Sequence, residues 1–233
     1  MEKAFIVVSL SLLIYQIFLK KSFLLNITTF LFMLSLIVYT IIVYKHFPVT
    51  GLFETLSFYV FCIVFLNLFI KNAHPKYYNL SNIYCAILLA FCLMLGTKKS
   101  AFTPDALNTV LFPLHVVFSF ISYAFFTSSF FLVISKSSTK KILDMNYLGF
   151  VTFTIGLWTG GIWAYKAWGA YFLYSIKEIF SFVLWVYFAS VIHIRFIKDR
   201  EKLLKLSTII GFAIVIFTYL GIGIFMKNTH SLG

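Results

Sequence analysis

Eight apolar runs limit the folds open to this chain more than any other feature. Inside a bilayer every backbone polar group needs a partner within the protein, so spanning segments are helices or closed barrels. Most runs have about 16–22 residues, close to the ~20 that a helix needs to cross a ~30 Å hydrocarbon core. They predict an all-α, polytopic membrane helical bundle of about eight transmembrane helices. The runs cover roughly 4–19, 23–44, 52–70, 80–97, 107–134, 147–165, 179–197 and 207–226.

Composition supports the same class. The chain is 61% hydrophobic and only 11% charged, whereas soluble domains carry roughly a quarter charged residues. The net charge of +12 is therefore attributed to basic loops at one membrane face, with no nucleic acid as partner. The three cysteines lie in apolar runs and form no C-x-x-C-H motif, so the chain is not itself a c-type cytochrome. Residues 1–233 are expected to form a single integral membrane domain.

Lysine and arginine are unevenly divided between the two sets of connections, which predicts the orientation. Of 19 such residues, 12 fall in one set and 7 in the other. The richer set is expected inside, which places both termini outside. It comprises Lys20, Lys21, Lys71, Lys76, Lys136, Lys140, Lys141, Arg195, Lys198, Arg200, Lys202 and Lys205. The poorer set comprises Lys3, Lys45, Lys98, Lys99, Lys166, Lys177 and Lys227.

An aromatic segment at 158–178 is the strongest functional signal and is predicted to be an external loop. Aromatic rings at a membrane interface often serve only as anchors, but this segment is unusually dense. Histidines stand on either side of it, at 115, 193 and 230. An aromatic platform bordered by histidines indicates a flat, apolar, iron-bearing ligand, and haem fits that description. The rings are Trp158, Trp163, Tyr165, Trp168, Tyr171, Phe172 and Tyr174.

The expected topology groups these residues by depth. His115 stands near the outer end of the fifth run and His230 follows the last one, so both are expected on the same face as the aromatic segment. His193 is 14 residues into the seventh run, or ~21 Å away at 1.5 Å per residue. It is therefore expected near the inner boundary. A histidine within a span is a functional candidate because burying it unpaired is costly, although His115 as a packing residue is an equally open reading.

The chain resembles the CcsA/ResC family of cytochrome c biogenesis, which is related to CcmC and CcmF. The family signature is roughly W-A-x-x-A-W-G-x-Y-W-x-W-D-P-K-E. Supporting segments are F-E-T-L-S-F at 53–58, L-H-V at 114–116, I-H-I-R at 192–195 and the ending Y-L-G…H-S-L-G at 219–233. Matches to the signature stand at Trp163, Ala164, Ala167, Trp168, Gly169, Tyr171, Lys177 and Glu178. Departures are Phe172 and Tyr174 for tryptophan, Ser175 for aspartate and Ile176 for proline.

The resemblance implies a function. The protein would receive haem b and present it at the outer face of the cell inner (plasma) membrane for attachment to apocytochrome c. His115 and His230 would ligate one haem iron. The loop from Trp163 through Trp168, Tyr171 and Phe172 to Tyr174 would lie against the porphyrin, with Lys177 near a propionate.

The resemblance also implies a second site and a partner. His193, with Arg195 near a propionate, would serve a haem at the inner side. A CcsB/ResB-type membrane subunit would supply the other ligand there, within a cytochrome c synthase (haem lyase) complex. Two alternatives remain open from the sequence: a b-type membrane haem protein that transfers electrons, and a polytopic transporter with an aromatic gate.

Overall fold

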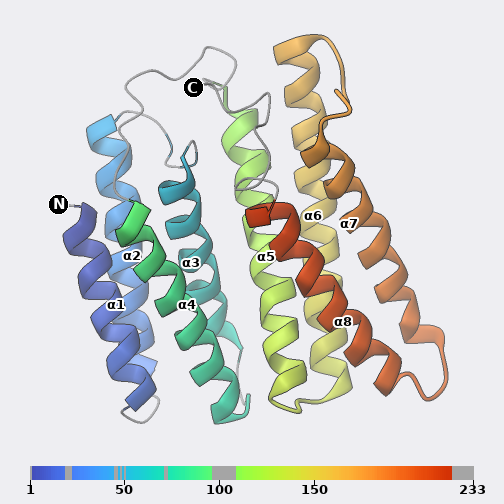
Figure 1. Cartoon of the computed structure of the whole chain (residues 1–233), viewed down its shortest axis with the longest axis horizontal. Coiled ribbons are helices and arrows are strands. Elements are labelled where there is room, and N and C mark those ends of the chain that lie inside the picture. Colours follow the sequence, from blue (N-terminus) through green and yellow to red (C-terminus); the bar gives the residue numbers. More distant parts are fainter. Residues whose placement is uncertain are drawn as a thin grey trace. The chain divides into compact units, whose positions relative to one another are not determined.

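Every regular element of the computed structural model is helical within the residues that it describes, which are 2–18, 23–44, 47, 49, 51–70, 73–95 and 109–221 (Figure 1). This confirms the predicted all-α class. The helices of this part are α1 (Glu2–Phe18), α2 (Phe23–Tyr44), α3 (Leu52–Phe69), α4 (Pro75–Leu95), α5 (Leu111–Ile134), α6 (Thr139–Trp168), α7 (Ile176–His193) and α8 (Glu201–Ile216). A 3-10 turn, η2 (Ile194–Phe196), follows α7, and a π-helical turn, η3 (Phe217–Gly221), follows α8.

Six helical stretches in the described part are long and apolar enough to cross a membrane, which confirms a multi-pass membrane protein. They are Leu24–Tyr44, Leu52–Phe69, Pro75–Leu95, Leu111–Ile134, Ile176–Phe196 and Glu201–Gly221. The two remaining helices are α1, with 17 residues, and α6, with 30 residues and several glycines and threonines among its apolar ones. The count of eight spans stays a prediction.

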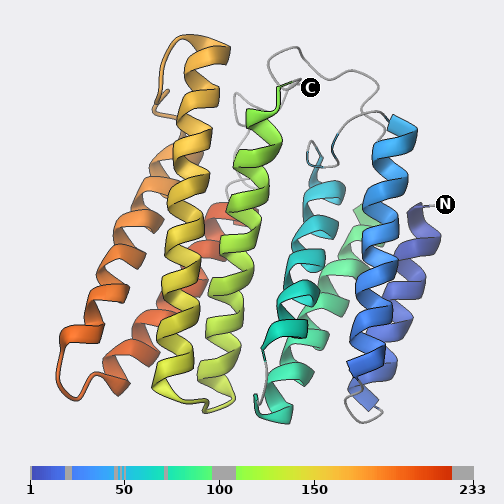
Figure 2. The same ribbon diagram turned by 180° about the vertical axis from the view of Figure 1, so that it is seen from behind.

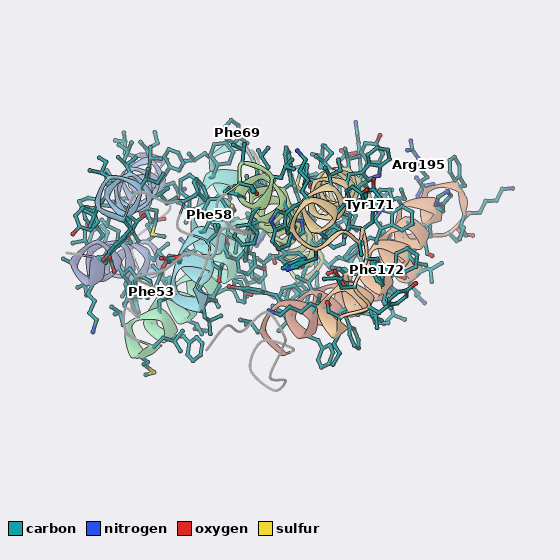
Figure 3. The ribbon with its side chains drawn as sticks, turned by 90° about the horizontal axis from the view of Figure 1, so that it is seen from above. Phe53, Phe58, Phe69, Tyr171, Phe172 and Arg195 are labelled. Carbon is teal, nitrogen blue, oxygen red and sulfur yellow. The ribbon has the colours of Figure 1, made fainter. Side chains whose placement is uncertain are left out.

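The chain divides into two compact units, Met1–Asn108 and Thr109–Gly233, and each is described by itself. In the first unit α1 packs against α2 and α4, and α3 packs against the same two helices. The four helices therefore close into a bundle. Phe53 and Phe58 of α3 are buried in it, whereas Phe69 is exposed at the end of the helix (Figure 3). The three cysteines are buried and unpaired with one another, in keeping with their place in apolar runs.

Polar side chains join the helices of the first unit inside its apolar core. The Gln16 amide of α1 donates to the Thr29 hydroxyl at 2.9 Å and to the Leu25 carbonyl at 3.1 Å, both on α2. Asn82 of α4 donates to the Gln16 carbonyl oxygen at 3.2 Å. Hydrogen bonds between membrane helices hold a bundle together where the hydrophobic effect does not act between them. Gln16 thus connects three helices.

We expect Gln16→Leu to weaken the first unit, because the Thr29 hydroxyl and the Asn82 amide then lose a partner in an apolar core. The loss should be about 1–2 kcal/mol, measured by chemical unfolding in detergent. Ser11→Ala is the matched control, since its hydroxyl bonds only the Val7 carbonyl of its own helix at an exposed position. Equal losses in the two variants would contradict a role for Gln16 in joining helices.

The second unit is built on an antiparallel hairpin of α5 and α6, which pack together along their lengths (Figure 2). Their connection, residues 135–138, is short, and Ser138 begins α6 by accepting a hydrogen bond from the Lys141 amide. Helix α8 packs on α5, while α7 packs on α6 and α8. The Phe126 and Phe188 rings stack at 3.5 Å between centroids, joining α5 to α7.

Candidate functional site

His115 lies one turn into α5, against the last third of α6. Its Nδ1 atom is 2.7 Å from the carbonyl oxygen of Gly156. A carbonyl only accepts hydrogen bonds, so Nδ1 is the donor and carries the proton. In the neutral ring this leaves the lone pair on Nε2, which is the form of imidazole that binds a metal. Pro113 stands in the first turn of α5, where its missing N–H has no partner to lose.

Aromatic side chains of α5 and α6 lie beside this histidine. The Trp163 ring is nearly parallel to the His115 ring, at 9° and 6.5 Å between centroids. Trp163 also contacts Phe112 of α5 at 5.0 Å and Trp168 at 4.7 Å. The last contact is edge-to-face, an arrangement that aromatic pairs prefer. Trp163 is half-buried and Trp168 is more exposed, so the rings lead from the helix interface towards the surface.

A second group of rings lies where the chain leaves α6 for α7 (Figure 3). Tyr165 and Tyr171 stack at 4.5 Å and 13°, and Phe172 meets Tyr174 edge-to-face at 5.0 Å. All four are exposed, with Tyr174 at 79%. The Tyr171 and Phe172 rings are therefore accessible at the surface of the second unit.

The structure corrects the predicted extent of the aromatic loop. Helix α6 continues to Trp168, so Trp158, Trp163 and Trp168 are helical and the loop covers only 169–175. A helix satisfies its own backbone groups, which favours its continuation through an apolar segment. It ends at Gly169, whose φ of 76° suits a residue without Cβ, and the Gly169 amide donates to the Tyr165 carbonyl.

A capping box at the start of α7 fixes the end of this loop. The Ser175 hydroxyl accepts from the Glu178 amide at 3.3 Å. The Glu178 carboxylate accepts from the amides of Ser175 at 2.9 Å and Leu173 at 3.0 Å. The S-x-x-E spacing that signals this motif is visible in the sequence, but sequence reasoning missed it. Ser175 stands where the resemblance has aspartate, and both residue types are preferred helix caps.

Lys177 and His193 stand at opposite ends of α7. Lys177 is exposed at the second position of the helix, beside the aromatic loop. His193 is the last residue of the helix, 16 positions after Lys177 and about 24 Å away at 1.5 Å per residue. Its Nδ1 lies 2.6 Å from the Ala189 carbonyl and its side chain is exposed. Arg195 follows in η2, with its guanidinium 5.5 Å from the Phe196 ring centroid. His193 therefore lies far from His115. The sequence predicted this separation.

His230 lies outside the described residues, as do all of 222–233. The structure thus brings together His115, Trp163 and Trp168 directly, with Tyr171, Phe172 and Tyr174 on the adjoining loop. Sequence reasoning also missed Phe112 and the Gly156 carbonyl. A ring one turn before the histidine in the same helix was the available signal for Phe112.

Ser175→Asp should leave the free energy of unfolding unchanged or slightly raised, because a carboxylate caps a helix as well as a hydroxyl and suits its N-terminus. Ser175→Ala should lower it by about 1 kcal/mol. Thermal unfolding in detergent measures both. A loss for Ser175→Asp as large as that for Ser175→Ala would contradict the capping role.

Comparison with known proteins places the chain in a clear group. Residues 49–230 match the family described as "Cytochrome C assembly protein". The chain is 30% identical over 216 residues to the cytochrome c biogenesis protein CcsA of Chlamydomonas reinhardtii, covering 81% of this chain and 61% of that protein. It is 28% identical over 283 residues to CcsA of Prochlorococcus marinus (strain MIT 9312), covering 98% and 91%. For CcsA of Mesostigma viride the identity is 26% over 237 residues, covering 81% and 78%.

Proposed function

This chain belongs to the cytochrome c assembly protein family, and we propose that within cytochrome c biogenesis it binds haem b and presents it for attachment to apocytochrome c. The observation that carries the proposal is the arrangement at His115. Its Nδ1 bonds a backbone carbonyl, so the neutral ring offers Nε2 as a ligand, and aromatic rings stand beside it.

The donor set fits an iron porphyrin. Imidazole nitrogen is a common axial ligand of haem iron. Exposed rings offer apolar faces for a flat macrocycle, and the Phe172 and Tyr174 rings keep that property at positions where the signature that the chain resembles has tryptophan. Lys177, exposed beside the loop, is a donor for a propionate carboxylate. Haem itself supplies the vinyl groups to which cysteine thiols of the apocytochrome add.

His230 is the second axial ligand in this proposal. With both imidazoles on the iron, no coordination position would remain open to oxygen. The ligand pair would come from distant parts of the chain, His115 on α5 and His230 after α8.

A second haem position is proposed at the other end of α7. His193 is exposed with Nδ1 bonded to the Ala189 carbonyl, so its Nε2 is also available as a ligand. Arg195 is exposed two residues further on and suits a propionate. The second ligand would come from a CcsB/ResB-type membrane subunit, and the two chains would form a cytochrome c synthase. The membrane would be the inner (plasma) membrane.

A b-type electron carrier is the main alternative. Such a protein normally pairs its histidines at similar depth on facing helices. In the described part of the second unit, His115 and His193 lie at opposite ends, which favours haem handling. For a transporter with an aromatic gate we find no observation that favours it over the family role.

Replacing either proposed ligand of the outer site should abolish the low-spin bis-histidine spectrum of the purified protein. We expect this for His115→Ala and His230→Ala, because one missing ligand opens a coordination position, and added imidazole should restore part of the signal. Pyridine haemochrome spectra identify the haem as type b. His74→Asn is the matched control, since His74 lies in the first unit, where its ring accepts from the Lys76 amide. Wild-type spectra in both alanine variants would refute the assignment.

Orientation follows from the basic residues around His193. Arg195, Lys198, Arg200, Lys202 and Lys205 stand at that end of the second unit, and positive residues favour the inner face. A reporter that is active only outside the cytoplasm should therefore be active when fused near Gly169 and inactive when fused near Lys198. The reverse pattern would put His115 on the wrong side for the apocytochrome.

A further inference from the structure

We infer that one face of α6, formed by Gly156, Gly160 and Trp163, clamps the His115 ring and fixes both its orientation and its tautomer, with Gly160 as the critical position. The inference rests on the proposed ligand role of His115. It gives Gly156 and Gly160 a positioning role, and gives Trp163 such a role in addition to the porphyrin contact that the resemblance implies.

The three residues share a helix face. Positions 156, 160 and 163 are spaced by four and three residues, so they lie on one face of α6. At the first two, glycine leaves that face without a side chain. Gly156 and Gly160 form a G-x-x-x-G pair, which allows two membrane helices to approach closely. Here the space serves a side chain, because the His115 ring occupies it.

Gly160 is where the fit is tightest. A Cβ atom at this position would overlap Nδ1 and Cε1 of the His115 ring and lie 3.1 Å from its Cγ. The ring therefore rests directly on the backbone of α6. Any larger residue would push the imidazole away from the helix and lengthen its bond to the Gly156 carbonyl.

Gly156 supplies the partner that selects the tautomer. Its carbonyl oxygen accepts from His115 Nδ1 at 2.7 Å and from the Thr159 hydroxyl at 3.0 Å. A Cβ at Gly156 would lie 3.1 Å from the Ser119 hydroxyl and 3.3 Å from the Ser119 amide nitrogen. The two glycines thus keep α5 close enough for the imidazole N–H to reach the carbonyl.

Trp163 limits the remaining freedom of the ring. It stands nearly parallel to the imidazole and is itself held between Phe112 and Trp168. Residues that orient a ligating histidine are worth about 10–100-fold in metal affinity. We assign that effect to this clamp, and it acts before any ligand arrives, because all its contacts lie within the chain.

The test compares two adjacent glycines of one helix. Gly160→Ala should weaken haem retention in the purified full-length protein by about 10–100-fold and reduce the low-spin spectrum, with partial recovery on adding imidazole. Gly161→Ala is the matched control. It makes the same change in the same turn, but its Cβ would meet only the Tyr171 carbonyl oxygen, at 3.8 Å. It should retain haem like wild type.

A second measurement isolates the contact from general damage to the fold. In haem-free protein Gly160→Ala should lower the thermal unfolding midpoint when His115 is present. In a His115→Ala background the same change should be neutral or stabilising, because the overlapping ring is gone and alanine favours a helix. Equal losses in both backgrounds would overturn the clamp.

The outcomes separate the clamp from the proposed function. Wild-type retention and spectrum in Gly160→Ala would overturn the clamp while leaving haem binding intact. Equal losses in Gly160→Ala and Gly161→Ala would also overturn it. Absence of a haem spectrum in wild-type protein would overturn the ligand role of His115 and, with it, the purpose assigned to the clamp.

Discussion

The pairing of α5 with α6 determines where the functional groups of the second unit lie. The helices are antiparallel with a short connection, so the start of α5 meets the end of α6. His115 and Trp163, 48 positions apart in the chain, become neighbours for that reason alone. The pairing is close because glycine occurs on α6 at the level of His115, and a backbone carbonyl can then serve as the histidine's partner.

Caps explain how the aromatic loop keeps its shape although its rings are exposed. Gly169 ends one helix and Ser175 begins the next, so the loop between them is short and held at both ends. The Glu178 carboxylate also accepts hydrogen bonds from the backbone amides of Leu173 and Ser175. A change from aspartate to serine at position 175 therefore preserves a cap. This argues that the charge of the aspartate in the family signature is not required for the shape of the loop.

The fold class and the grouping of His115 with Trp163 and Trp168 were predictable, because apolar runs identify the helices, and the start of one span lies at the same membrane face as the end of the next. The continuation of α6 beyond the predicted run 147–165 to Trp168 was not, since an aromatic segment that contains glycine is equally compatible with a loop. The Gln16 network was also missed, because its members lie far apart in sequence. The carbonyl partner of His115 carries no sequence signal of its own, and the G-x-x-x-G spacing of Gly156 and Gly160, which is compatible with a close helix approach, was not recognised in the sequence.

His115 and His193, the histidines in the described part of the second unit, are held in different ways. Both bond a backbone carbonyl through Nδ1, but His115 bonds a neighbouring helix and His193 bonds its own. The first bond exists only while α5 and α6 stay packed, so the orientation of His115 depends on tertiary structure. The second survives any movement of α7 as a whole. If the proposed function is correct, the fixed orientation of His115 suits a site that presents haem in one geometry, and the exposed, locally held His193 suits a site that a partner completes.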